Sequence, residues 1–227
     1  MPDSLNMVHI LEDKQKTFAS MTAAVLGIMV LWFSLPKVFT LVSTYQKRAS
    51  KMTISVSIPI EERKVIEKDI FDIQGTIRSS DKKGNANYSD QYFTLGTYFE
   101  RLGYLGKAEG AYRKALREDS KNVPAYTHLG VVLGLMEDYD KSVASFREGI
   151  ERDPSNTEAY TKLADMYASH MKQREEGRGV YIEGLMRTQN APDLVRSFIA
   201  FLDRTGYTHE ADLYRKALRK EKNTKRP

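Results

Sequence analysis

The chain has 227 residues, of which 41% are hydrophobic and 29% are charged, so it is neither an intrinsically disordered protein nor a polytopic membrane protein. It contains no cysteine, which excludes a disulfide framework, a thiolate metal site and a cysteine nucleophile. The net charge of +5 comes from residues 215–227, which carry +6, so it reflects a basic tail and not a general nucleic-acid-binding surface.

An uncharged, apolar run extends from Thr17 to Leu35. As a helix rising about 1.5 Å per residue, it would span roughly 28 Å, close to the roughly 30 Å of a bilayer core. We therefore predict a tail over residues 1–16 and a transmembrane helix over 17–42, kinked or interrupted at Pro36. A buried core helix is the first alternative, and the length and flanking charges of the run argue against it. A cleaved signal peptide is the second, but the run is too long and no small-residue cleavage site follows it.

The run predicts a single-pass membrane protein held in the bilayer by residues 17–35. Two lysines precede the run, and four basic residues follow it between Lys37 and Lys51. This imbalance favours a cytoplasmic carboxyl-terminal side, but only weakly. Against it, a short amino-terminal tail followed by a long exported domain is a common bacterial arrangement, so the side of the soluble part stays open.

A linker follows over residues 43–88. Apolar and polar residues alternate from Met52 to Ile60, which is a strand pattern. A helical solenoid offers no partner for such a strand, so the segment is expected to be an extended linker or an edge that pairs with another chain. Residues 61–78 predict an amphipathic helix with a stripe of four isoleucines, widened by Val65 and Phe71. We expect this helix to pack on the first repeat as a cap; docking on a partner or on a second copy is the alternative. The stripe consists of Ile66, Ile70, Ile73 and Ile77.

The rest of the chain repeats with a period of 34 residues. Three kinds of residue recur in register: Tyr92, Tyr126 and Tyr160; Leu95, Leu129 and Leu163; Gly96, Gly130 and Ala164. The hexapeptide YRKALR at 112–117 returns at 214–219, three periods later. This pattern resembles the tetratricopeptide repeat, in which an aromatic residue, a leucine and a glycine in one helix are followed by a small residue and an aromatic in the next.

The resemblance implies an all-α solenoid of three to four helix pairs over residues 89–220, followed by a basic tail at 221–227. The first two units are regular, the third slips by one residue in its second half, and the fourth is degenerate. Small residues such as Gly130 are expected to let paired helices approach closely. Asn122 and Asn156 are expected to cap the helices that follow them, and the last helix should present a polar outer face.

The resemblance also implies a protein partner, because tetratricopeptide arrays bind peptides or helices in a groove lined by the first helix of each unit. Members that grip chaperone carboxyl termini have lysine and asparagine where this chain has Phe93 and Thr97, so a chaperone clamp is not expected. We expect a membrane-anchored adaptor or assembly scaffold, with a constitutive accessory subunit of a larger membrane complex as the alternative. By repeat position, the groove residues are Phe93, Thr97, Glu100, Arg101, Thr127, Val131, Thr161 and Asp165.

No catalytic residue, cofactor or metal site is predicted. The four histidines lack metal-ligand spacing, and no glycine-rich phosphate loop occurs. Ser34 and Lys37 have the spacing of a serine–lysine motif but lie at the predicted membrane boundary without its partner motifs. The basic tail has no interleaved aromatic residues, so we expect a solvated capping helix and not a nucleic-acid or lipid site. Neither an enzyme nor a small-molecule substrate is expected.

Overall fold

The structure is a computed structural model that describes residues 52–80 and 87–224. The predicted tail (1–16) and transmembrane helix (17–42) lie outside the described residues, as do residues 43–51 and 81–86 of the linker. None of the helices in the described part combines the length and apolar character needed to cross a bilayer.

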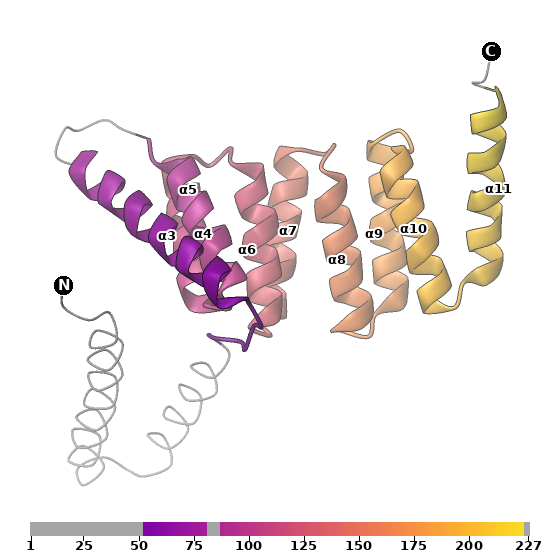
Figure 1. Cartoon of the computed structure of the whole chain (residues 1–227). Helices are drawn as coiled ribbons and strands as arrows, with labels where there is room; N and C mark the ends of the chain where they lie inside the picture. The colour runs from indigo at the N-terminus through magenta and orange to yellow at the C-terminus, as the bar shows by residue number, and fades with distance from the viewer. Residues whose placement is uncertain (1–51, 81–86, 225–227) are drawn as a thin grey trace, which may run out of the picture. The chain divides into compact units, whose positions relative to one another are not determined.

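The described residues form nine helices and no strand, which confirms an all-α fold. Helices α4 to α11 stand side by side in chain order as four pairs, and α3 runs obliquely against the first pair (Figure 1). We call the first member of each pair (α4, α6, α8, α10) a first helix and the other a second helix. The bounds are α3 Ile60–Ser80, α4 Ser89–Arg101, α5 Leu105–Glu118, α6 Val123–Leu135, α7 Tyr139–Arg152, α8 Thr157–Ser169, α9 Arg174–Arg187, α10 Pro192–Thr205 and α11 Thr208–Thr224.

Small residues sit where the two helices of a pair meet, as predicted. A Cβ added to Gly130 on α6 would lie 2.7 Å from Cε1 of Phe146 on α7. The hydroxyl of Ser142 donates to the carbonyl oxygen of the same glycine at 2.6 Å. The glycine thus lets an aromatic ring and a hydroxyl both reach the α6 backbone, which a larger side chain would prevent.

Asparagines join one pair to the next. The Asn122 side chain accepts a hydrogen bond from the Ala125 backbone N–H at 3.2 Å and so caps α6. Its amide also donates to Ser89 Oγ at 2.9 Å, back on α4. Asn156 caps α8 in the same way, and its amide donates to Thr127 Oγ1 on α6 at 3.1 Å. The predicted caps are therefore confirmed, and each also ties its helix to the preceding pair.

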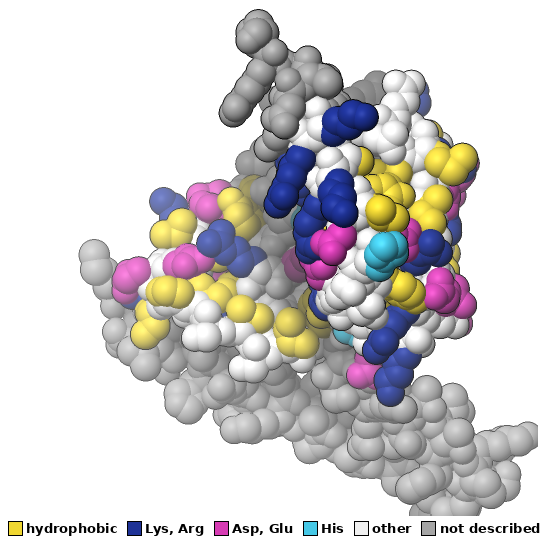
Figure 2. Space-filling view, turned by 90° about the vertical axis from the view of Figure 1, so that its right-hand side faces the viewer, with side chains coloured by type: hydrophobic (Ala, Val, Ile, Leu, Met, Phe, Trp, Pro, Cys, Tyr) yellow, Lys and Arg dark blue, Asp and Glu magenta, His cyan; other side chains and the backbone are white. Residues whose placement is uncertain are grey.

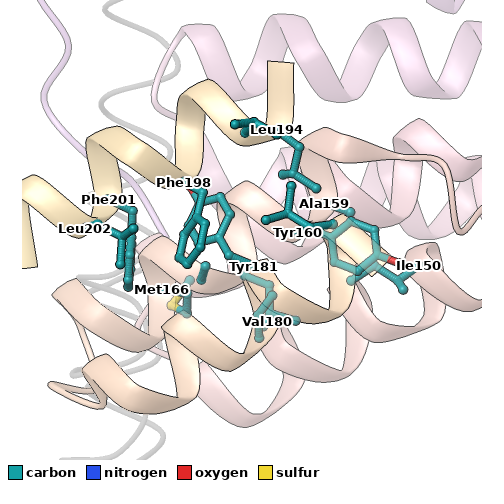
Figure 3. Close-up of a cluster of buried hydrophobic side chains, with 14 of the residues drawn as sticks. Ile150, Ala159, Tyr160, Met166, Val180, Tyr181, Leu194, Phe198, Phe201 and Leu202 are labelled. Atoms are coloured by element: carbon teal, nitrogen blue, oxygen red, sulfur yellow. The ribbon is translucent and has the colours of Figure 1, made fainter. Parts of the chain in front are cut away.

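Aromatic residues fill the centre of the second half of the solenoid (Figure 3). The ring of Tyr181 stacks on Phe198 with centroids 5.1 Å apart and contacts Phe201 at 5.0 Å. The predicted slip in the third unit comes from the connection between its helices: residues 170–173 separate α8 from α9, one residue more than the 136–138 that separate α6 from α7. Gly177 therefore occupies the fourth position of α9, as Ser142 does on α7, and a Cβ there would lie 2.7 Å from the carbonyl oxygen of Ala164.

Helix α3 caps the first pair, which confirms the predicted packing. Ile66 and Ile70 are buried against Leu95 and Leu102 of the first repeat, and Ile73 and Ile77 are partly buried beside them. The prediction that Val65 and Phe71 widen this stripe is wrong. Both point away from the solenoid, and Phe71 is 74% exposed.

The segment before α3 is not a strand. The Ile54 backbone N–H donates to the Gly103 carbonyl oxygen at 2.9 Å, and the Gly106 N–H donates to the Met52 carbonyl oxygen at 3.0 Å. Gly103 has a left-handed φ of 78°, and a Cβ there would lie 2.3 Å from the Ile54 oxygen. The segment therefore hydrogen-bonds to the turn between α4 and α5, a contact that the sequence pattern did not predict.

Helix α11 closes the carboxyl-terminal end. Ala211 is buried against the core, whereas Leu213, Lys216 and Arg219 are exposed. Figure 2 shows Lys and Arg side chains gathered on this end of the molecule. Such a polar outer face is what a terminal repeat needs to remain soluble.

Candidate functional site

The predicted groove residues lie on three consecutive first helices. Phe93, Thr97, Glu100 and Arg101 are on α4, Thr127 and Val131 on α6, and Thr161 and Asp165 on α8. Successive first helices contact one another. We call the side of the solenoid that these helices form the first-helix surface.

Thr127 does not belong to the accessible part of this surface. The residue is only 2% exposed, and its hydroxyl accepts a hydrogen bond from the Asn156 amide at 3.1 Å. Repeat position alone does not reveal this burial, because the covering residue comes from the next unit. The hydroxyl thus joins two repeats and is not open to a partner.

Two charged residues of the set are paired within the chain. Arg101 forms an ion pair with Glu62 of α3, and Asp165 forms one with Arg204 of α10. These pairs link neighbouring structural units across the first-helix surface. Because both pairs are largely solvent-exposed, each adds at most about 1 kcal/mol to stability. Their main effect on the surface is to neutralise charges that a partner would otherwise meet.

The threonines contribute little free hydrogen-bonding capacity. The hydroxyl of Thr97 donates to the carbonyl oxygen of Thr94 at 2.8 Å, and that of Thr161 donates to the carbonyl oxygen of Thr157 at 3.0 Å. Val131 is half-buried between them on α6. This part of the surface therefore offers hydrocarbon with satisfied polar groups, which suits an apolar or backbone contact more than a charged ligand.

Glu100 is different, because its partners are aromatic residues. Its Oε2 accepts a hydrogen bond from the Tyr112 hydroxyl at 2.6 Å and lies 3.0 Å from Nδ1 of His128. The Phe93 ring stands 5.3 Å from the imidazole and 5.8 Å from the phenol, centroid to centroid. Burial raises the pKa of Tyr112 well above its usual value, and the hydrogen bond and charge of Glu100 raise it further. Tyr112 therefore stays a donor to the carboxylate.

The sequence indicated Glu100 and Phe93 but not this arrangement. Tyr112 begins the recurring hexapeptide at 112–117, and His128 is one of the four histidines that lack metal-ligand spacing. They reach Glu100 from 12 and 28 residues further along the chain, on α5 and α6. No local spacing signals such a contact, although the 34-residue period places the helices side by side.

The second helices carry a network of ion pairs instead. Glu183 on α9 lies 2.5 Å from Arg147 on α7 and 3.5 Å from Arg187, which in turn contacts Glu151 at 3.2 Å. Open space of about 380 Å³ lies between α5, α6 and α7, bordered by Arg117 and Tyr126 among others. Across residues 52–80 and 87–224, no three metal-ligating side chains come together.

A tetratricopeptide repeat family model matches residues 91–122 and 123–156. The fold is similar to a crystal structure of MamA, with 20% identity, a TM-score of 0.50 and coverage of 75% of this chain and 98% of that one. It is also similar to TTC0263, a thermophilic TPR protein of Thermus thermophilus, with 19% identity, a TM-score of 0.50 and coverage of 61% and 73%. No curated protein matched the sequence. The family model thus shows two tetratricopeptide repeats over residues 91–156, and the two structural likenesses, both under 25% identity, extend to the fold alone.

Proposed function

We propose that the protein is an adaptor or assembly scaffold that binds another protein on its first-helix surface and holds it at a membrane. The observation that carries the proposal is the arrangement of four helix pairs that leaves Phe93, Thr97, Val131 and Thr161 partly exposed along one side. Packing within the solenoid does not fully cover these side chains. A partner peptide or helix would bury them further, at roughly 25 cal/mol for each Å² of apolar surface.

The membrane part of the proposal depends on the apolar run of residues 17–35. A helix of that length and hydrophobicity partitions into the bilayer, so the chain should resist extraction by alkaline carbonate. Removal of residues 1–50 should release the compact unit Lys51–Pro227 into the soluble fraction. If the truncated chain still sedimented with membranes, the apolar run would not be the sole anchor, and the basic face of α11 would become the next candidate.

The alternative is a constitutive subunit of a larger membrane complex. The exposed apolar residues before and on α3, among them Ile60 and Phe71, favour it because a permanent neighbour would cover them. Native-gel sizing after mild detergent extraction separates the two roles. A constitutive subunit migrates entirely with its complex, whereas an adaptor leaves a large free fraction.

We propose binding and not catalysis as the activity. The chain has no cysteine, and neither the sequence nor the described site pairs a nucleophile with a base beside an oxyanion-stabilising group. A protein partner therefore accounts for the surface better than a small-molecule substrate or a nucleic acid does.

A further inference from the structure

The carboxylate of Glu100 is held in one orientation. Tyr112 and His128 both contact Oε2, from α5 and α6, while the carboxylate itself comes from α4. No hydrogen bond or ion pair from residues 52–80 or 87–224 reaches Oε1. The side chain is 23% exposed, so this second oxygen belongs to a partly accessible, preorganised acceptor.

The negative charge of Glu100 also lacks a lysine or arginine partner within the described chain. Glu183 and Glu210 on the solenoid, in contrast, each have one: Glu183 contacts two arginines, and Glu210 binds Arg178 at 2.8 Å. The nearest candidate in sequence, Arg101, is paired with Glu62 of α3 instead. A carboxylate that is partly desolvated and has no cationic partner gains more from a ligand cation than an exposed one does.

The walls beside the carboxylate are aromatic. Phe93 and His128 are both half-buried, with their rings nearly perpendicular and 5.3 Å apart. Aromatic faces attract cations and also cover the methylene stem of a long charged side chain. An ammonium group at Oε1 would therefore find a charge partner and apolar contacts for its stem at the same place.

We propose that Glu100, Phe93 and His128 form a binding site for a lysine side chain of the partner protein. Lysine fits better than arginine because only one carboxylate oxygen is free. A guanidinium group prefers two parallel hydrogen bonds to both oxygens, whereas an ammonium group acts as a compact point charge. The inference rests on the proposed use of the first-helix surface for protein binding, and it specifies what one position of the bound segment presents.

The test uses the full chain in neutral detergent micelles, with ¹³C-labelled histidine. Its four histidines give few signals, so the resonance of His128 can be followed while the probe is added. The probe is N-acetyl-lysine methylamide, and N-acetyl-norleucine methylamide is its uncharged counterpart. The site predicts a saturable shift of the His128 signal with the lysine probe and a much smaller one with norleucine.

Variants separate recognition from a structural role. Glu100→Gln keeps an oxygen for Tyr112 but removes the charge, and it should weaken lysine binding by about tenfold or more, since charge-assisted hydrogen bonds contribute about 1.5–3 kcal/mol. Phe93→Leu keeps the carboxylate and should weaken binding several-fold by removing the aromatic face. Glu183→Gln is the matched control: that side chain is 29% exposed but already bound by arginines, so lysine binding should not change.

Three results would overturn the proposal. The first is no shift of His128 with the lysine probe, and the second is an equal shift with norleucine. The third is lysine binding that Glu100→Gln leaves intact. Tighter binding of N-acetyl-arginine methylamide would contradict the choice of lysine. The proposed function has a separate test, which is photo-crosslinking of a partner protein to position 131 on the same first-helix surface. That crosslink can form even if the lysine site fails, so the two failures are distinguishable.

Discussion

Helix α9 contains three glycines, and two of them allow a sharp test of the packing between α8 and α9. Glycine inside a helix is roughly 1 kcal/mol less favourable than alanine. Replacing either Gly177 or Gly179 by alanine should therefore stabilise the helix backbone by about the same amount. A Cβ on Gly179 would meet nothing within 4 Å. A Cβ on Gly177 would lie 2.7 Å from the Ala164 carbonyl oxygen and 3.0 Å from Phe201.

The gain in helix propensity is about the same in both variants, so the difference between their free energies of unfolding measures the packing cost at Gly177. Overpacking of this kind costs about 1–3 kcal/mol. Gly179→Ala should therefore be more stable than the parent chain by up to about 1 kcal/mol, and Gly177→Ala should be less stable than Gly179→Ala by about 1–3 kcal/mol. Urea unfolding of the unit 51–227, followed by circular dichroism at constant m-value, measures both. Equal stabilisation by the two alanines would refute the close approach of α9 to α8.

Three further predictions concern the α3 cap, the junction at Asn156 and the pH dependence of stability. Ile70→Asp should destabilise the unit 51–227 by more than about 2 kcal/mol, because it places a charge where α3 packs on the first repeat. Phe71→Asp, on the exposed side of α3, should have little effect; equal losses of stability in thermal melts of the two variants would argue against the cap. Asn156→Ala should cost about 1 kcal/mol or more in urea unfolding, since it removes both a helix cap and a link to the preceding pair; an unchanged midpoint would contradict that role. Burial raises the pKa of Tyr112 and of Tyr181 in the folded state. Their stabilising effect is therefore full below the unfolded pKa of about 10 and lost as the pH rises above it. Circular dichroism in moderate urea should show unfolding above about pH 10, and a midpoint that stays independent of pH up to about pH 12 would be inconsistent with buried tyrosines.

The sequence predicted the repeats well because their packing constraints are local and periodic. Gly130 and the aromatic residue 16 positions later, Phe146, recur as a pair since each regular helix pair has the same close approach, so a self-comparison at 34 residues finds them. The isoleucine stripe of residues 61–78 was equally clear, because a single helix face carries it. These features need only one helix or one repeat to be recognised.

Contacts between repeats were harder to predict. The burial of Thr127 depends on Asn156 of the following unit, and the site around Glu100 depends on residues from three helices. The alternation in residues 52–60 matched a strand pattern, but it could not reveal that the segment hydrogen-bonds to the turn at Gly103. In each case the partner is distant in sequence and its identity follows from geometry, not from spacing.

The central claim is that the first-helix surface binds a protein partner. Its most direct test is site-specific photo-crosslinking in cells that produce the full chain, with a photoreactive amino acid at Val131 on α6 or at Met186 on α9. Met186 is the control because it lies on a second helix, is 77% exposed and is also apolar. We predict a discrete crosslinked protein from Val131 and none from Met186. Adducts from Met186 alone, or equal adducts from both positions, would contradict the claim.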